Sequence, residues 1–217
     1  MNRKLNVGVI GVGRLGKTYA RYFCGRIENA TLTAISDVSA ETLESVGTEL
    51  GVSNRYERPE DLIADKSVDA VVIVSPTSTH KEIALQAAEH GKPTFCEKPL
   101  SISLPDALSM QRTIEQSGAF FQMGFQRRFD NGYVAAKRKI NDGLIGNLVL
   151  FKSSSRDPQR PSLEYLNPAT SGGLIIDCGI HDLDLARWFM GEVESVYSIG
   201  GTLAYPEIEL IEQEGHQ

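Results

Sequence analysis

The chain lacks the features that would place it in a membrane, on a nucleic acid or in an oxidising compartment. Its apolar runs are short, and even VDAVVIV is far below the length that spans a bilayer. Acidic residues outnumber basic ones, 28 to 22, which argues against polyanionic partners. The N-terminal stretch MNRKLNVGVIG has no signal-peptide core. These absences predict a cytoplasmic protein with no nucleic-acid or membrane partner.

Cysteine and histidine are also scarce. The three cysteines form no C-x-x-C pair, which predicts free thiols in a reducing compartment. The four histidines are too dispersed to form a metal site by their spacing, so no metal is expected. These residues are Cys24, Cys96, Cys178, His80, His90, His181 and His216.

Glycine, in contrast, is concentrated just after the first apolar run, where GVGRLG has the pattern G-x-G-x-x-G. In a strand-to-helix turn, the first glycine allows the tight bend and the second lets a pyrophosphate approach the backbone. The third lets helix and strand pack closely. The helix N-terminus then offers N–H groups and partial positive charge to phosphates. The turn residues expected to bind a dinucleotide are Gly11, Gly13, Arg14, Leu15 and Gly16.

An acid ends the second apolar run, TLTAISD, about 20 residues after the last glycine of the turn. Asp37 can accept hydrogen bonds from both ribose hydroxyls and would repel a 2′-phosphate, so NAD is favoured over NADP. A lone G-x-G-x-x-G also occurs in ordinary turns. Here strand, turn, helix, second strand and acid follow in order, which favours cofactor binding.

Short β-branched runs alternate with helical patterns over residues 1–124, which predicts an α/β domain with a doubly wound parallel sheet. The expected strands are 5–10, 31–37, a short one around 55–56, 68–74, 93–96 and 119–125. The expected helices are 14–24, 40–50, a brief one from 59, 78–90 and 104–117, the last with Ser103 as its N-cap.

The pattern changes over residues 125–217. Helices are expected at 131–141 and 174–190, and strands at 148–154 and 193–203. A proline-rich loop is expected over residues 156–171, between the first of these strands and the second helix. Two strands and two helices cannot close an independent sheet. The sequence therefore predicts a partial second domain of the mixed α+β type.

Two polar segments follow neighbouring central strands, where open α/β sheets bind their ligands. They are Ser75-Pro76-Thr77 and Glu97-Lys98-Pro99. Pro99 restricts Lys98 to an extended backbone, so the ammonium would be held near the nicotinamide and could hydrogen-bond a substrate hydroxyl. Alternatively, Glu97 and Lys98 are a solvated ion pair before a turn. The sequence leaves the isomer of the Lys98–Pro99 bond open.

His80 is placed among the expected cofactor contacts because it lies near the start of the helix that follows Ser75-Pro76-Thr77. Its position nevertheless argues against a direct ligand role.

Three residues of DCGIHDLDLARW, Asp177, His181 and Asp184, are spaced i, i+4 and i+7 and share one face of a helix. A carboxylate four residues from a histidine can fix its tautomer and stabilise the imidazolium, which suits proton transfer. Alternatively, the acids complement the helix dipole and His181 is merely packed.

Further polar residues flank these segments. Arg127 and Arg128 follow the sixth strand, where guanidinium groups can bind hydroxyls or carboxylates, or form salt bridges between domains. Asp157, in SSSRDP, follows an expected strand and could accept a hydrogen bond from a polyol hydroxyl.

Together these segments resemble the glucose–fructose oxidoreductase and inositol dehydrogenase family, and most closely its inositol 2-dehydrogenases. The motifs that carry the resemblance are GVGRLG, SPTSTH, CEKPLS, GFQRRFD, SRDP followed by SGG, and DCGIHDLDLARW. The resemblance implies a Rossmann domain followed by a mixed-sheet domain. That second domain would form one wall of a substrate cleft and mediate dimers or tetramers.

The same resemblance implies NAD-dependent oxidation of a secondary hydroxyl of a polyol or sugar, with inositol as the expected substrate. Lys98 would contact the reacting hydroxyl, His181 would take its proton, and Asp177 would orient the imidazole. Arg127, Asp157 and Asp184 match positions that line the polyol pocket.

The resemblance departs at the end of the chain, after IELIEQEGHQ, where the family pattern continues into further strands. We therefore expect a C-terminally truncated form, with an unpaired strand edge and poor solubility or association with another chain. Two alternatives remain open. One is a dehydrogenase of another sugar or cyclic polyol, and the other is a catalytically silent dinucleotide-binding remnant.

Overall fold

A computed structural model describes residues 3–156 and 166–201. The chain divides into two compact units, Met1–Gly124 and Phe125–Gln217.

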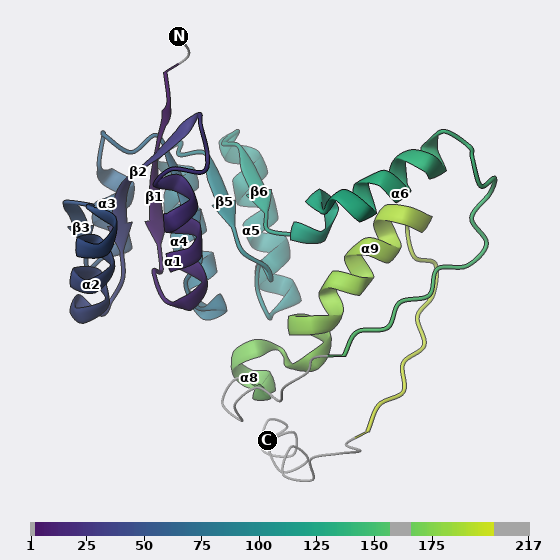
Figure 1. The fold of residues 1–217 in the computed structure, drawn as a ribbon. Coiled ribbons are helices and arrows are strands. Elements are labelled where there is room, and N and C mark those ends of the chain that lie inside the picture. The colour runs from purple at the N-terminus through teal and green to yellow at the C-terminus, as the bar shows by residue number, and fades with distance from the viewer. Residues whose placement is uncertain (1–2, 157–165, 202–217) are drawn as a thin grey trace. The chain divides into compact units, whose positions relative to one another are not determined.

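The first unit contains a six-stranded sheet in which all neighbouring strands are parallel (Figure 1). The strand order is β3-β2-β1-β4-β5-β6, so the direction of winding reverses between β1 and β4. The strands are β1 (Leu5–Ile10), β2 (Ala30–Ser36), β3 (Asn54–Tyr56), β4 (Ala70–Ile73), β5 (Thr94–Cys96) and β6 (Phe121–Met123). This topology confirms the predicted doubly wound fold.

Helices cover both faces of this sheet. They are α1 (Arg14–Phe23), α2 (Ala40–Leu50), α3 (Pro59–Ala64), α4 (Thr77–Glu89) and α5 (Leu104–Ser117). Alternate residues of β1 face opposite ways, so Val7 and Val9 pack with α1 and α2 while Ile10 packs with α3, α4 and α5. Burial on both faces explains why the strands were readable as nearly continuous apolar runs.

The ends of α5 follow local sequence signals. The Ser103 hydroxyl accepts a hydrogen bond from the Asp106 N–H at 3.4 Å, and Gly118 closes the helix in the left-handed region with φ of 68°. The predicted Ser103 cap is therefore confirmed.

The second unit is helical in the part that the structure describes. Its elements are the 3₁₀ turn η1 (Gln126–Phe129), α6 (Asn131–Asn141), the short α8 (Pro168–Ser171), the π-helical η2 (Ile175–Gly179) and α9 (Ile180–Met190). The centroid of the Phe189 ring lies 5.7 Å from that of Phe151, 6.4 Å from that of Tyr133 and 5.2 Å from that of Trp188, so these side chains form an aromatic cluster in this unit.

The strands expected at 148–154 and 193–203 are not formed in the described residues, and 202–203 lie outside them. A strand needs a hydrogen-bonded neighbour, and none is present in residues 125–156 and 166–201. Val149, Leu150 and Val196 are accordingly 90%, 81% and 81% exposed. The sequence pattern identifies these segments as apolar and β-branched, but a strand also needs a paired neighbour, which a local pattern does not supply.

No helix within residues 3–156 and 166–201 has the length and apolar character needed to cross a membrane. In that same part of the chain, no group of three or more histidine, cysteine or acidic side chains could hold a metal ion.

Candidate functional site

Two glycines of the first turn are required by the protein's own backbone. Gly11 has φ of +81°, and a Cβ there would lie 2.6 Å from the Ser75 nitrogen. A Cβ on Gly16 would lie 1.7 Å from the Gly11 carbonyl oxygen. A side chain on Gly11 would therefore push against the backbone that follows β4, and a side chain on Gly16 would push α1 away from the glycine turn.

Gly13 differs from both. Its φ of −64° suits any residue, and a Cβ there would meet nothing within 4 Å. Gly13 is the N-cap of α1, whose N-terminus has no side-chain cap and no acid in its first turn. As an N-cap, glycine is better tolerated than alanine, but no contact within the described chain requires the absence of a Cβ here. The open space in front of an uncapped helix N-terminus fits the close approach of an anion such as a pyrophosphate.

The carboxylate of Asp37 is fixed beside the same turn. Its Oδ2 accepts a hydrogen bond from the Val12 N–H at 2.9 Å, and its Oδ1 accepts one from the Ser39 N–H at 3.0 Å. A carboxylate oxygen can accept more than one hydrogen bond, so both oxygens can still receive ribose hydroxyls. The turn and the acid form one rigid arrangement.

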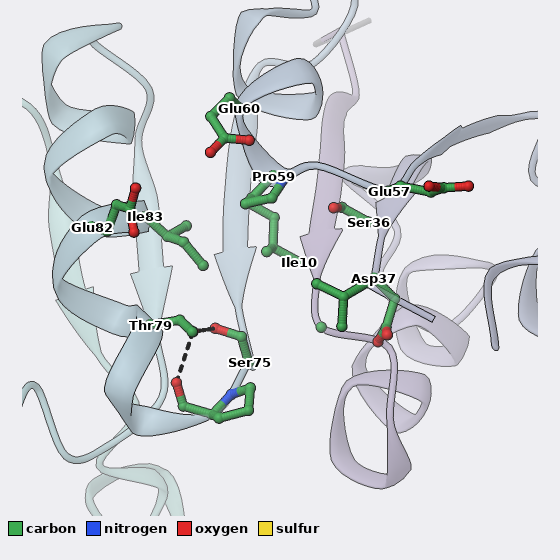
Figure 2. Close-up of a pocket in the computed structure, with 13 residues that line it drawn as sticks. Ile10, Ser36, Asp37, Glu57, Pro59, Glu60, Ser75, Thr79, Glu82 and Ile83 are labelled. Carbon is green, nitrogen blue, oxygen red and sulfur yellow. Dashed lines mark hydrogen bonds between the residues drawn. The ribbon is translucent and has the colours of Figure 1, made fainter. Parts of the chain in front are cut away.

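A pocket of about 330 Å³ opens next to Asp37, at the carboxyl ends of β1, β2 and β4 (Figure 2). Four predicted cofactor residues line it: Gly11, Asp37, Ser75 and Pro76. The other lining residues are Ile10, Ser36, Val38, Glu57, Pro59, Glu60, Thr79, Glu82 and Ile83. None of the thirteen is basic. The pocket combines apolar walls with acidic groups, which suits an adenosine and disfavours a 2′-phosphate.

The remaining residues of the first segment lie at the start of α4. Thr77 is the first residue of that helix, and the Thr79 hydroxyl lies 2.7 Å from Ser75 Oγ and 2.8 Å from the Pro76 carbonyl oxygen. These hydrogen bonds, drawn in Figure 2, fix the shape of the loop that borders the pocket.

The segment Glu97-Lys98-Pro99 follows β5 and is fastened to α1. Glu97 accepts hydrogen bonds from the Tyr19 hydroxyl and from the Lys98 N–H, the latter at 3.2 Å. Burial and the neighbouring Glu97 carboxylate raise the pKa of Tyr19 well above its ordinary value. The Lys98–Pro99 peptide bond is cis. Glu97 therefore connects α1 to the loop after β5 by hydrogen bonds, a structural role that the sequence alone did not indicate.

His80 lies inside the unit with an exposed fraction of only 1%. Its Nδ1 is 2.8 Å from the Pro99 carbonyl oxygen and its Nε2 is 3.0 Å from the Ser75 carbonyl oxygen. The ring thus joins the two loops that carry the predicted cofactor and substrate residues. This position favours a positioning role over direct cofactor contact.

In the second unit, Asp177 lies in η2 and His181 in the first turn of α9. Both side chains are half-buried. The sequence predicted one regular helix over 174–190, but its first part is π-helical, with wider i→i+5 turns. The extra residue in such a turn shifts the faces before and after it, and π-turns are frequent at functional sites.

Two arginine–aspartate pairs connect η1 to α9. Arg128 binds Asp184 through two parallel contacts, Nε to Oδ2 at 2.8 Å and Nη2 to Oδ1 at 2.7 Å. Arg127 Nη1 donates to Asp182 Oδ1 at 2.7 Å. Burial opposes ionisation of Asp182, but hydrogen bonds from Ser153 and Arg127 outweigh it and lower the pKa of this carboxyl.

Sequence reasoning missed Asp182, although it stands in the same HDLD run as two predicted residues. Of the predicted polyol-pocket residues, Asp157 lies outside the described residues. Lys98 belongs to the first unit, and Asp177, His181, Arg127 and Asp184 belong to the second. That all of them act on one substrate is a proposal.

The sheet order, the glycine turn and the fixed acid define a dinucleotide-binding Rossmann domain. A family described as an oxidoreductase family with an NAD-binding Rossmann fold matches residues 5–125, and the GFO/IDH/MocA C-terminal domain matches residues 133–213. The chain belongs to the GFO/IDH/MocA oxidoreductase family. NAD as cofactor, predicted from Asp37, agrees with the family description.

Several curated proteins to which this chain is similar are named inositol dehydrogenases. The chain is 39% identical over 210 residues to scyllo-inositol 2-dehydrogenase (NAD(+)) of Bacillus subtilis (strain 168), covering 96% of this chain and 61% of that protein. It is 40% identical over 205 residues to myo-inositol 2-dehydrogenase of Thermotoga maritima, covering 94% and 60%. The chain thus spans about 60% of the length of these curated relatives.

A solved structure agrees with these similarities. Scyllo-inositol dehydrogenase from Lactobacillus casei, crystallised with NAD(H) and scyllo-inositol, superposes with a TM-score of 0.88 at 36% identity. The match covers 97% of this chain and 63% of that one.

Proposed function

We propose that this chain serves the NAD-dependent oxidation of a secondary hydroxyl of inositol to a ketone. The observation that carries the proposal is a pair of hydrogen bonds to the Glu97 carboxylate, one from the Tyr19 hydroxyl in α1 and one from the Lys98 backbone N–H. It joins the helix that receives the pyrophosphate to the lysine expected to meet the substrate. A lysine held next to a nicotinamide site has a use in hydroxyl oxidation that a solvated surface lysine does not have.

The described residues fit NAD. The space at Gly13 admits the pyrophosphate to the N-terminus of α1, and Asp37 accepts the ribose hydroxyls. The pocket beyond Asp37 receives the adenine. Bound NAD supplies the hydride acceptor, C4 of its nicotinamide ring.

The chain's own residues handle the proton and the substrate. The Lys98 ammonium donates a hydrogen bond to the reacting hydroxyl oxygen and stabilises negative charge as it develops there. His181 takes the hydroxyl proton as hydride leaves the same carbon, and Asp177 orients the imidazole and stabilises its charged form. The π-turn at Ile175–Gly179, which contains Asp177, supports this assignment, because such turns occur often at functional sites.

Residues 125–217 would then form the substrate-binding part, preceded by the NAD-binding domain of residues 1–124. Arg127 and Asp184, with Asp157, are proposed to border the ring hydroxyls. The aspartate partners of the two arginines hold their guanidinium groups in fixed directions, which suits recognition of a polyol. Association into dimers or tetramers is part of the same proposal.

The direct test supplies the chain with NAD and either myo-inositol or scyllo-inositol and follows NADH by its absorbance. NADH should accumulate, and Lys98→Ala and His181→Ala should each slow its formation by at least about 100-fold. A matched control is His90→Ala, an exposed histidine at the end of α4, which should leave the rate unchanged. Failure to reduce NAD with any inositol or aldose, in a protein that binds NAD, would contradict the proposed activity.

A second candidate is a dinucleotide-binding protein without turnover. The observation that favours it is that the described features that fit NAD all lie in the first unit. It predicts NAD binding by calorimetry, no NADH formation, and no effect of His181→Ala. A third candidate is oxidation of another sugar or cyclic polyol, which predicts turnover with an aldose and not with either inositol.

A further inference from the structure

One buried polar group that lines the pocket of the first unit has no hydrogen-bond partner among the described residues. Ser36, the last residue of β2, is only 1% exposed and lines the pocket beside Asp37. Its Oγ is buried and has no hydrogen-bond partner among the residues that the structure describes. A buried hydroxyl without a partner destabilises a fold, so the protein gains nothing from serine here unless something else supplies the partner.

The face of β2 on which Ser36 lies shows from which side a hydrogen-bond partner would have to approach its hydroxyl. β2 alternates its faces, so Ile35 packs toward α1 and α2 while Ala34 packs toward α3 and α4. Ser36 therefore faces the α3 and α4 side, where the pocket lies, and Figure 2 shows its oxygen turned toward the space between Ile10 and Pro59.

The rest of the pocket restricts the ligand group that can meet Ser36. Ile10, Pro59 and Ile83 give flat apolar walls, which suit a heteroaromatic ring. Glu57, Glu60 and Glu82 lie around it, and a carboxylate can only accept hydrogen bonds. Glu60 lies 3.5 Å from the Arg58 guanidinium. Neither Glu57 nor Glu82 forms an ion pair within the described part of the chain, and of these two only Glu82 stands on α4, on the side that Ser36 faces. Adenine has ring nitrogens that accept and an amino group that donates, which matches this set of groups.

We propose that Ser36 and Glu82 determine the base specificity of the dinucleotide site. Ser36 donates its hydroxyl hydrogen to a ring nitrogen of adenine, and the Glu82 carboxylate accepts a hydrogen bond from the adenine amino group. Hypoxanthine has a carbonyl oxygen in place of that amino group, so its oxygen would face a carboxylate. The inference rests on the proposed NAD binding and adds to it the residues that select the base.

Calorimetry on the whole chain tests the proposal, with NAD and nicotinamide hypoxanthine dinucleotide as ligands and the melting temperature as a second readout. The unchanged chain should bind NAD about tenfold more tightly than nicotinamide hypoxanthine dinucleotide, which is the affinity difference expected from one good hydrogen bond. Ser36→Ala should weaken NAD binding about tenfold while the melting temperature stays the same or rises, because an unpartnered hydroxyl has been removed. Glu82→Gln should bring the two affinities close together, because an amide can both donate and accept.

Ser117→Ala is the matched control. Ser117 Oγ hydrogen-bonds the Ile114 carbonyl oxygen at 2.7 Å at the end of α5, so this change should lower the melting temperature and leave both affinities unchanged.

Three results would overturn the proposal. The first is equal affinity of the unchanged chain for the two dinucleotides. The second is a Ser36→Ala protein that melts earlier and binds NAD normally, which would make the hydroxyl structural. The third is a Ser36→Ala loss that disappears with a dinucleotide lacking the adenosine 2′-hydroxyl, which would assign Ser36 to the ribose. Absence of any NAD binding by the unchanged chain would contradict this proposal and the proposed function together. NAD binding without base preference would contradict this proposal alone.

Discussion

The Tyr19 hydroxyl donates a hydrogen bond to the carboxylate of Glu97, across 78 residues of sequence. Tyr19 lies in α1, three residues after the last glycine of the turn, and its ring packs 5.5 Å from that of Phe95. Glu97 accepts a second hydrogen bond from the Lys98 N–H. The helix proposed to face the pyrophosphate and the lysine proposed to face the substrate are thus connected through Glu97.

Removing this hydroxyl should affect turnover more than cofactor binding. Tyr19→Phe keeps the ring and deletes the donor, so Glu97 can turn away and the Lys98 backbone loses its constraint. We expect kcat to fall about tenfold with little change in NAD affinity, and stability to fall by about 1 kcal/mol. Steady-state NADH formation and urea unfolding measure the two effects.

Tyr56→Phe is the control for that change, because the Tyr56 hydroxyl donates to Asp65 Oδ2 at 2.9 Å on the other side of the unit. It should cost a similar amount of stability and leave kcat unchanged. A kcat loss shared by both variants would mean that Tyr19 acts only through general stability.

Alkaline pH should weaken the fold through the same residue. The pKa of Tyr19 is raised in the folded protein, so above its ordinary value near 10 the unfolded chain releases this proton and the folded chain does not. The stabilisation is complete below pH 10 and is lost as pH rises beyond it. The stability difference between the unchanged protein and Tyr19→Phe should therefore shrink between pH 9 and 11 in urea unfolding. A difference that grows over this range would contradict the assignment.

His80 should be essential to both loops that it joins. The flexible side chain of His80→Gln cannot hold polar atoms against both the Pro99 and the Ser75 carbonyl oxygens as the rigid ring does. We expect a loss of about 1–3 kcal/mol in stability together with slower turnover. His90→Gln, at an exposed ring that bonds the Gln86 carbonyl oxygen at 2.9 Å, should change neither. Normal stability and rate in His80→Gln would contradict the positioning role.

The two-point pair of Arg128 with Asp184 should stabilise the second unit. Asp184 is only 9% exposed, so Asp184→Asn leaves the guanidinium without its charged partner and should cost about 1–3 kcal/mol in thermal or urea unfolding. Glu192→Gln breaks the exposed pair with Arg187 and should have little effect. A similar loss of stability in Asp184→Asn and Glu192→Gln would contradict the claim that the buried ion pair stabilises the unit more than the exposed one.

The first unit was predictable because its signals are local. A strand buried on both faces gives a continuous apolar run, so the expected strand 68–74 contains the observed β4. The N-cap at Ser103 and the glycine turn each depend on only a few neighbouring residues, so the sequence predicts both. The cofactor prediction followed from these short-range features.

The rest depended on residues far apart in sequence. The strands expected at 148–154 and 193–203 need partners that no local pattern supplies. The hydrogen bonds of Glu97 to Tyr19 and of His80 to Pro99, and the pairing of Arg127 with Asp182, arise only when the chain folds. The π-turn at Ile175–Gly179 had no recognised signal, and the unpartnered hydroxyl of Ser36 is visible only when every neighbour is known.

Gly13→Ala tests the central claim, that NAD lies against the first turn, most directly. The backbone at Gly13 is extended and a Cβ there touches nothing, so the fold should lose at most about 1 kcal/mol, the cost of alanine in place of glycine at a helix N-cap. Gly11→Ala, at φ of +81°, should destabilise the protein more strongly and serves as the contrast. Calorimetric titration of Gly13→Ala with NAD should show affinity reduced at least about tenfold with only a small fall in melting temperature. NAD binding by Gly13→Ala as tight as that of the unchanged chain would contradict the account.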